Sequence, residues 1–198
     1  MMGTMDDKKH KAKYKAYYKP GLLDPEFHQK LVENIDRICS MGRIPALYVY
    51  GVPLSKYCDE ADRKYVEGFR SWKKKGVAGM AYVGGVPHIA DRMMAIAGAL
   101  TRNYVEAQVM TIQEVIQSVK DNNTPTSTCL LIPNFYLPKD QGGSIPDWQV
   151  SMVMAMLMER FAQGVQTVIY VQDLNKLERD YGRPMLEFIR DHLYIVEG

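Results

Sequence analysis

Residues 79–100 have the types and spacing of a phosphate-binding strand, loop and helix. A short apolar strand is expected at 78–83, followed by Gly84-Gly85 and then by a helix rich in small residues over about 88–101. Such an arrangement directs the backbone amides at the start of a helix toward an anion. The sequence therefore predicts the shape of a phosphate-binding loop.

The side chains that would hold a nucleotide are absent from this loop. A nucleotide-binding loop reads G-x-x-x-x-G-K-[ST], in which the lysine contacts the phosphates and the hydroxyl binds the metal ion. Here the lysine position falls on Ile89 or Ala90, depending on the register, and the hydroxyl position falls on Ala90 or Asp91. Asp91 would also repel a triphosphate near the start of the helix. We expect at most a vestigial nucleotide site, made of Gly84, Gly85, Pro87, His88, Ile89 and Ala90.

No other residues form a catalytic or metal-binding pattern. The two glycines are more typical of a tight turn than of an anion-binding nest, although both interpretations stay open. His28, His88 and His192 have no second ligand at a suitable spacing, so we expect them to be structural. We predict no catalytic residue, no metal and no cofactor.

Composition places the chain among ordinary globular proteins. Its 198 residues are 46% hydrophobic and 24% charged, which suits one domain with a short extension. No window approaches 18 uncharged apolar residues and the N-terminus lacks an apolar signal core, so we expect a cytoplasmic protein without a membrane span. Cys39, Cys58 and Cys129 are widely spaced without a C-x-x-C pair, which fits a reducing compartment and argues against structural zinc.

Positive charge is concentrated at the N-terminus. Residues 1–20 contain six lysines and two aspartates, a local charge of +4, so the other residues sum to −2 in a chain of net charge +2. Lysines next to stackable rings are typical of sequence-indifferent single-strand binding. A solvated tail and an arm that contacts a partner protein are the alternatives. The residues concerned are Lys8, Lys9, Lys11, Lys13, Tyr14, Lys15, Tyr17, Tyr18 and Lys19.

We divide the chain into a basic flexible arm at 1–20, an N-terminal helical extension at 21–75 and a core at 76–198. In the extension, a helix is expected to start at Asp24-Pro25-Glu26, with apolar positions that begin at Phe27. The run at 47–50 is interpreted as a small strand, and 59–73 as a surface helix.

Strands and helices alternate in the core. Thr111 and Glu114 form a capping-box pattern that fixes one helix start. The alternation predicts an α/β fold with a mostly parallel sheet that helices cover on both faces. Strands are expected at 78–83, 106–110, 129–132, 167–171 and 193–196, and helices at 88–101, 111–120, 147–163 and 174–191.

The order of these elements resembles the AAA+ domain of the bacterial and phage helicase-loader family, which also includes the ATP-binding partners of insertion-sequence transposases. The resemblance covers about residues 60–198, rests on order and spacing, and implies a three-layer, P-loop NTPase-like fold. The segments that carry it are 75–83 at the phosphate loop, 95–100 in the helix after it, 105–120 at the second strand and its helix, 128–134 at the Walker B strand, 148–164 in the helix before the sensor strand, 167–182 at the sensor strand, and 189–198 at the close.

Departures from the family fall on its catalytic positions. Pro133-Asn134 replaces the two acidic residues of Walker B, so neither a magnesium-bound water nor the attacking water would be held. Asp173 stands at the sensor asparagine, and Phe188 stands where family members offer an arginine to a neighbour's nucleotide. Losing one charge-stabilising group typically lowers the rate ~10²–10³-fold. The combined losses predict no ATPase activity.

The resemblance and its departures predict a catalytically inactive AAA+-like protein that acts by binding. The expected partner is a replicative helicase or an active AAA+ ATPase, with single-stranded DNA at the arm, in replication of a phage or mobile element. One alternative is a P-loop ATPase, a helicase loader or transposition regulator, that binds ATP and magnesium in an unorthodox way. Another is an inhibitor or adaptor of host replication machinery. A nucleotide-free homo-oligomer stays open.

The helix at 147–163 is apolar almost all round and contains Met152, Met154, Met156 and Met158. Such a helix is usually buried between layers. Alternatively, part of it meets a partner protein, since methionine side chains adapt to a groove.

Overall fold

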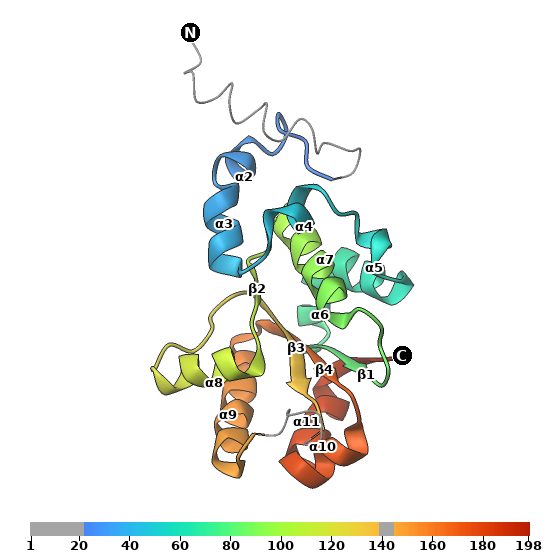
Figure 1. Cartoon of the computed structure of the whole chain (residues 1–198), viewed down its shortest axis with the longest axis vertical. Helices are drawn as coiled ribbons and strands as arrows, with labels where there is room; N and C mark the ends of the chain where they lie inside the picture. The colour runs from blue at the N-terminus through green and yellow to red at the C-terminus, as the bar shows by residue number, and fades with distance from the viewer. Residues whose placement is uncertain (1–21, 139–144) are drawn as a thin grey trace.

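A computed structural model of the chain describes residues 22–138 and 145–198. Its centre is a five-stranded sheet in the order β2-β3-β4-β1-β5, with every pair parallel (Figure 1). The strands are β1 (Gly79–Val83), β2 (Ala107–Val109), β3 (Cys129–Tyr136), β4 (Gln166–Val171) and β5 (Leu193–Glu197). The arm at 1–20 lies outside the described residues.

Helices precede the sheet and connect its strands. Those before β1 are α2 (Gln29–Glu33), α3 (Ile35–Gly42), α4 (Ala46–Tyr50), the short 3₁₀ helix η1 (Leu54–Lys56), α5 (Glu60–Glu67) and α6 (Phe69–Lys74). Those after β1 are α7 (Ile89–Arg102), α8 (Ile112–Lys120), α9 (Asp147–Gln163), α10 (Leu174–Tyr181) and α11 (Arg183–His192).

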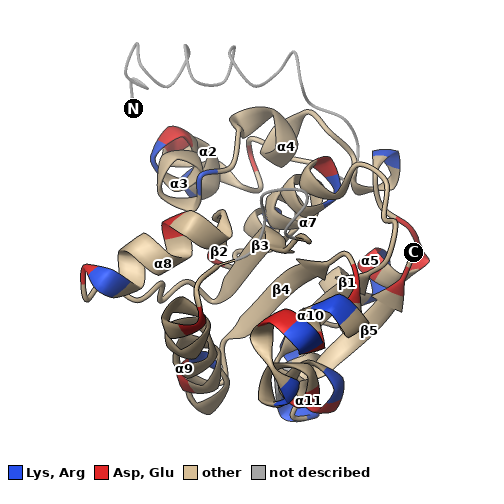
Figure 2. Ribbon diagram, turned by 60° about the horizontal axis from the view of Figure 1, so that its bottom comes forward, with Lys and Arg blue, Asp and Glu red and all other residues tan. Residues whose placement is uncertain are grey.

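Alternate side chains of the strands enter two separate hydrophobic cores. In β1, Met80 and Tyr82 belong to the core that α2 to α7 cover, whereas Ala81 belongs to the core that α8 to α11 cover. Figure 2 shows the strands almost free of charged residues, which gather on the helices around them. This confirms the predicted α/β fold with helices on both faces of a parallel sheet.

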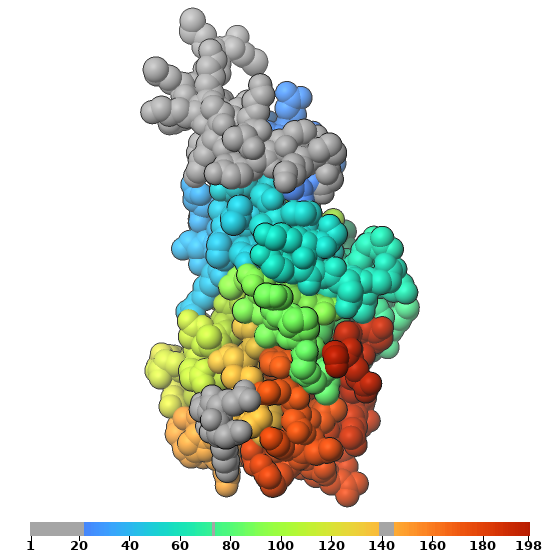
Figure 3. All heavy atoms as spheres, turned by 45° about the vertical axis from the view of Figure 1, so that its right-hand side comes forward, coloured from blue at the N-terminus to red at the C-terminus, as the bar shows by residue number. Residues whose placement is uncertain are grey.

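The helices before β1 share a core with the sheet. The buried Tyr65 of α5 donates a hydrogen bond to Gln166 Oε1 of β4 at 2.6 Å, and Gln166 Nε2 donates to the Phe69 carbonyl at 2.9 Å. In the space-filling view these helices, blue to teal, lie directly against α7 in green (Figure 3). The first core therefore cannot form from residues 76–198 alone.

Several local predictions need correction. Residues 47–50 form part of helix α4 and not a strand, because the run lies against α7 and not at the edge of the sheet. Phe27, predicted to be apolar core, is 79% exposed, since the backbone amides of Glu26 and Phe27 bond to the Asp24 carboxylate in a turn before α2. The predicted helix at 59–73 is divided at Gly68 into α5 and α6.

Other boundaries follow the predicted signals. The Thr111 hydroxyl accepts from the Glu114 amide at 3.3 Å, and the Glu114 carboxylate accepts from the Thr111 amide at 2.8 Å, which confirms the capping box. Gly164 ends α9 in the left-handed conformation.

The methionines of α9 have different environments. Met156 is buried, Met152 and Met154 are half-buried, and Met158 is 48% exposed. Part of this helix is therefore core and part is surface.

No helix in the described ranges combines the length and apolar character needed to cross a bilayer.

Candidate nucleotide-like site

The predicted site lies at the carboxyl ends of the central strands. From β1 the chain crosses to β2 at one edge of the sheet, whereas β5 lies on the other side of β1. Ligands of open parallel sheets bind at the point where the strand order reverses, outside the carboxyl ends. Residues 84–88, which join β1 to α7, occupy this position. They contain most of the residues predicted for a vestigial nucleotide site.

Backbone groups of this loop are engaged within the protein. The Gly84 amide donates to the Val171 carbonyl at 3.1 Å, and the Val86 amide donates to the Gly84 carbonyl at 3.0 Å. The Tyr170 hydroxyl donates to the same Gly84 carbonyl at 2.9 Å. Two amides that an anion-binding loop would direct at a phosphate are therefore already bonded.

The C-terminal residues pack beside the same loop. The Gly198 amide donates to the Val83 carbonyl at 2.9 Å, and Val86 is buried against Gly198. A side chain at Gly84, whose φ is +95°, would approach the Gly198 carbonyl to 3.2 Å. Gly84 therefore allows a turn that needs a positive φ and that lies in close contact with the end of the chain after β5. Gly85 is exposed and has open space around it.

The first turn of α7 presents no cation. His88 is exposed, adopts a left-handed conformation with φ of 51°, and makes no side-chain cap to the helix. Pro87 and Ala90 are exposed, and Ile89 is partly buried against the first core. The loop thus brings the predicted residues together without a group that would pair with a phosphate.

Asp91 supplies a negative charge at the start of α7. Its carboxylate accepts a hydrogen bond from the hydroxyl of Tyr48, on α4. Burial, together with the hydrogen bond to Asp91 and its charge, raises the pKa of Tyr48 to about 12. A carboxylate at a helix N-terminus satisfies the helix dipole and disfavours a second anion there.

Arg92 is the nearest cation in α7, and its charge is neutralised inside the protein. The residue is 8% exposed, and its guanidinium lies 2.5 Å from Asp59 Oδ2 and 2.7 Å from Asp62 Oδ2. It also lies over the Tyr82 ring, 4.7 Å from the ring centroid, while the Tyr82 hydroxyl donates to Asp62. Sequence reasoning missed this cluster. Its only signal was the pair of carboxylates at the start of α5, Asp59 at the cap and Asp62 in the first turn.

The two residues predicted at Walker B, Pro133 and Asn134, have structural roles. The register of β3 against β4 shifts between Ile132 and Tyr136, and Pro133, which has no amide hydrogen to donate to a ladder, lies within this irregularity. Asn134 Oδ1 accepts from the Ile112 amide at 2.9 Å, and its Nδ2 donates to Gln113 Oε1 at 3.0 Å. Asn134 therefore holds the start of α8.

The residues predicted at the sensor and arginine-finger positions, Asp173 and Phe188, also make structural contacts. The Asp173 carboxylate caps α10 by accepting from the amides of Asn175 at 2.9 Å and Lys176 at 3.0 Å. Phe188 is 5% exposed and contacts the Phe161 ring at 6.2 Å and the His192 ring at 5.1 Å between centroids. Phe188 thus lies in the second core, on α11, and not at the loop.

Arg160 is a buried residue that was not predicted from the sequence. It is 1% exposed and donates to Thr167 Oγ1 and to the carbonyls of Pro125, Ser127 and Gln166, at 2.6–3.0 Å. No ion pair with a carboxylate is recorded for it among the described residues. Burial lowers its pKa to about 10. It connects the end of α9 to the segments that enter β3 and β4.

The described ranges contain no cluster of three histidine, cysteine, aspartate or glutamate side chains suited to a metal ion. The lysines and tyrosines predicted for nucleic-acid or partner binding lie outside these ranges, so that prediction stays open.

Among solved structures, one similar chain belongs to a replication-related protein. No protein-family model matches the chain, and no curated protein matches it. The chain is similar to the crystal structure of a candidate primosome component from Streptococcus pyogenes serotype M3, with 15% identity and a TM-score of 0.49. The match covers 78% of this chain and 89% of the other. A similarity this low carries no argument about function, which has to be argued from the residues of this chain.

Proposed function

We propose that this protein is a catalytically inactive AAA+-like protein of the helicase-loader type, which acts by binding a replicative helicase or a related ATPase. The proposal combines the resemblance in the order of its elements with the state of the β1–α7 loop. It places the protein in replication of a phage or mobile element.

One observation supports the inactive part of the proposal: two amides of the loop are bonded within the protein, and a carboxylate lies at the start of the helix that follows. The amides of Gly84 and Val86 bond to carbonyls of the protein, and Asp91 stands at the helix start. A triphosphate would meet a carboxylate in place of a lysine. Since phosphoryl transfer depends on charge neutralisation around the γ-phosphate, this environment supports neither binding nor turnover.

The first test is nucleotide binding by the full chain. A ligand present at one hundred times its Kd stabilises the folded state by about 2.7 kcal/mol. In a protein of this size that gain raises Tm by roughly 5–11 °C, at about 2–4 °C per kcal/mol. We expect millimolar ATP with magnesium to leave Tm where magnesium alone leaves it. A saturable rise, or any magnesium-dependent hydrolysis, would favour the unorthodox ATPase.

The second test is binding to a purified replicative helicase from the native host, measured by interferometry with and without residues 1–20. We expect a stoichiometric complex that needs no nucleotide. If binding survives the deletion, the docking surface lies on the body. Salt-dependent single-strand binding that the deletion abolishes would support a DNA-binding arm. Absence of binding to helicase and to AAA+ partners alike would contradict the proposal.

A further inference from the structure

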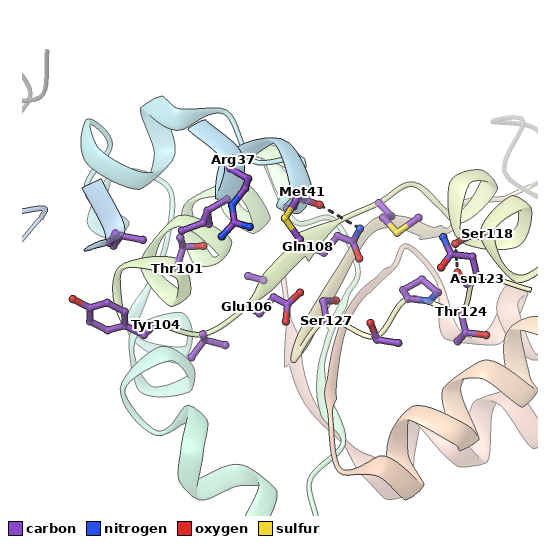
Figure 4. Close-up of a pocket in the computed structure, with 18 residues that line it drawn as sticks. Arg37, Met41, Thr101, Tyr104, Glu106, Gln108, Ser118, Asn123, Thr124 and Ser127 are labelled. Carbon is purple, nitrogen blue, oxygen red and sulfur yellow. Dashed lines mark hydrogen bonds between the residues drawn. The ribbon is translucent and has the colours of Figure 1, made fainter. Parts of the chain in front are cut away.

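A cavity opens at the amino ends of the strands, at the opposite end of the sheet from the β1–α7 loop. It has a volume of about 580 Å³ and lies between α3, the end of α7, the start of β2 and the segment that leads into β3 (Figure 4). Because all strands are parallel, the residues before β2 and β3 lie at the amino end of the sheet, away from the β1–α7 loop. Its size is that of pockets that hold small ligands.

The cavity combines apolar walls with two opposite charges at its rim. Arg37 and Glu106 are both exposed, and neither takes part in an ion pair recorded for the described residues. In Figure 4 the Arg37 side chain extends from α3 toward the space above β2, where Glu106 lies. The apolar lining consists of Leu31, Ile38, Met41, Val105 and Met110.

The floor contains a polar group without a partner. Ser127 is 4% exposed, and its hydroxyl forms no hydrogen bond within the described part of the chain. In Figure 4 Ser127 lies beside Glu106, below Gln108. A buried hydroxyl is nearly always bonded, and this one is closed off from the cavity, so it is a polar atom that the packing of the floor leaves unsatisfied.

We propose that this cavity binds a small zwitterion with an apolar body, of the chemical class of α-amino acids. The carboxylate of such a ligand would pair with Arg37 and its ammonium group with Glu106, while its side chain would fill the apolar part that Ile38, Met41 and Met110 line. The two charges of the lining cancel, which disfavours a polyanion such as a nucleotide, because one arginine cannot offset several phosphate charges beside a glutamate.

This site is independent of the proposed function, since it shares no residue with the β1–α7 loop. Ligand in the cavity would contact both α3 and β2. It would therefore connect a helix of the N-terminal segment to the edge of the sheet.

The test is a panel of the twenty L-amino acids, screened by thermal shift on the full chain and followed by calorimetry. We expect saturable binding by one or more members with apolar or long side chains. Arg37→Gln and Glu106→Gln should each weaken binding about tenfold or more, because each removes a charge-assisted hydrogen bond. Arg190→Gln and Glu178→Gln, exposed on α11 and α10, are the matched controls and should bind as the parent does.

The assignment of each charge has its own readout. N-acetylation of the ligand removes the ammonium group and should weaken binding to the parent but have little further effect on Glu106→Gln. Ser127→Ala should leave the unliganded protein as stable or more stable, because it removes an unsatisfied hydroxyl, and should leave ligand affinity unchanged, because that hydroxyl is closed off from the cavity. No saturable binding across the panel, or unchanged binding in both rim variants, would overturn the proposal while leaving the helicase proposal untouched.

Discussion

At the scale of single residues, the side chains predicted to stand at catalytic positions of the resembled family make structural contacts. Asn134 fixes the start of α8, Asp173 caps α10 and Phe188 fills the second core. Arg92, next to the lost lysine position, joins Asp59 and Asp62 in place of a nucleotide. Each side chain therefore has a structural partner where a nucleotide-binding protein would have a ligand.

The Asp62 cluster should be the most sensitive of these sites. Asp62→Asn removes the fully buried charge that pairs with Arg92, and we expect the free energy of unfolding to fall by about 1–3 kcal/mol, because the buried guanidinium keeps only the Asp59 carboxylate as an ionic partner. Urea denaturation monitored by circular dichroism measures this loss. Asp191→Asn, exposed on α11, should change stability by less than about 0.5 kcal/mol. Equal effects would show that the buried pair contributes no stability of its own.

Two substitutions at Asp173 test whether its side chain acts as a helix cap. Asp173→Ala removes the acceptor for the Asn175 and Lys176 amides, and we expect a loss of about 1 kcal/mol. Asp173→Asn restores the asparagine of the resembled family and caps nearly as well, so its stability should match the parent within a few tenths of a kcal/mol. Thermal denaturation of the two variants checks this. A stable alanine variant would contradict the capping role.

At the scale of elements, close backbone contacts determine how the N-terminal helices meet the core. A side chain at Gly98, in the middle of α7, would lie 2.1 Å from the Tyr48 carbonyl of α4. Gly98→Ala should favour an isolated helix by about 1 kcal/mol. In the protein we expect a net loss of about 1–3 kcal/mol, since α4 must move. Gly85→Ala meets open space and is the control, with a change below about 0.5 kcal/mol in chemical denaturation.

The contact between α3 and α8 should depend on pH. Burial raises the pKa of Glu114, but hydrogen bonds from Thr111 and the ion pair with Arg43 outweigh it, so the pKa lies below its ordinary value of 4.5. The stabilisation that the ionised Glu114 carboxylate contributes is therefore present above pH 4.5 and disappears as the pH falls through the lower folded-state pKa. Glu114→Gln keeps the capping box but loses the charge.

We expect Glu114→Gln to be about 0.3–1 kcal/mol less stable than the parent at pH 7 and equally stable near pH 2.5. Urea titrations at several pH values provide the comparison. Glu178→Gln should show no such convergence. A difference in stability between the parent and Glu114→Gln that persists at low pH would show that it comes from the changed side-chain group and not from the lost charge.

At the scale of the whole molecule, one face of the sheet depends on segments that come before β1. Removing residues 1–75 would expose Met80, Tyr82, Met93 and Ile96, which are fully buried in the first core. We expect the fragment 76–198 to bind a hydrophobic dye, lose near-ultraviolet circular dichroism and unfold without cooperativity. A cooperative transition close to that of the parent would show that the second core suffices.

Local sequence patterns were enough to predict the parallel α/β fold, the capping box at Thr111 and a helix that ends at residue 163, because periodicity and caps act over one or two turns of chain. The sequence also indicated that the β1–α7 loop lacks a lysine and a hydroxyl. It could not place Asp62 beside Arg92, Arg160 beside Pro125, or Ser127 at the floor of a cavity. Those neighbours lie 30 or more residues apart or come from separate elements, so only the packing of helices against both faces of the sheet decided which polar groups met and which stayed free.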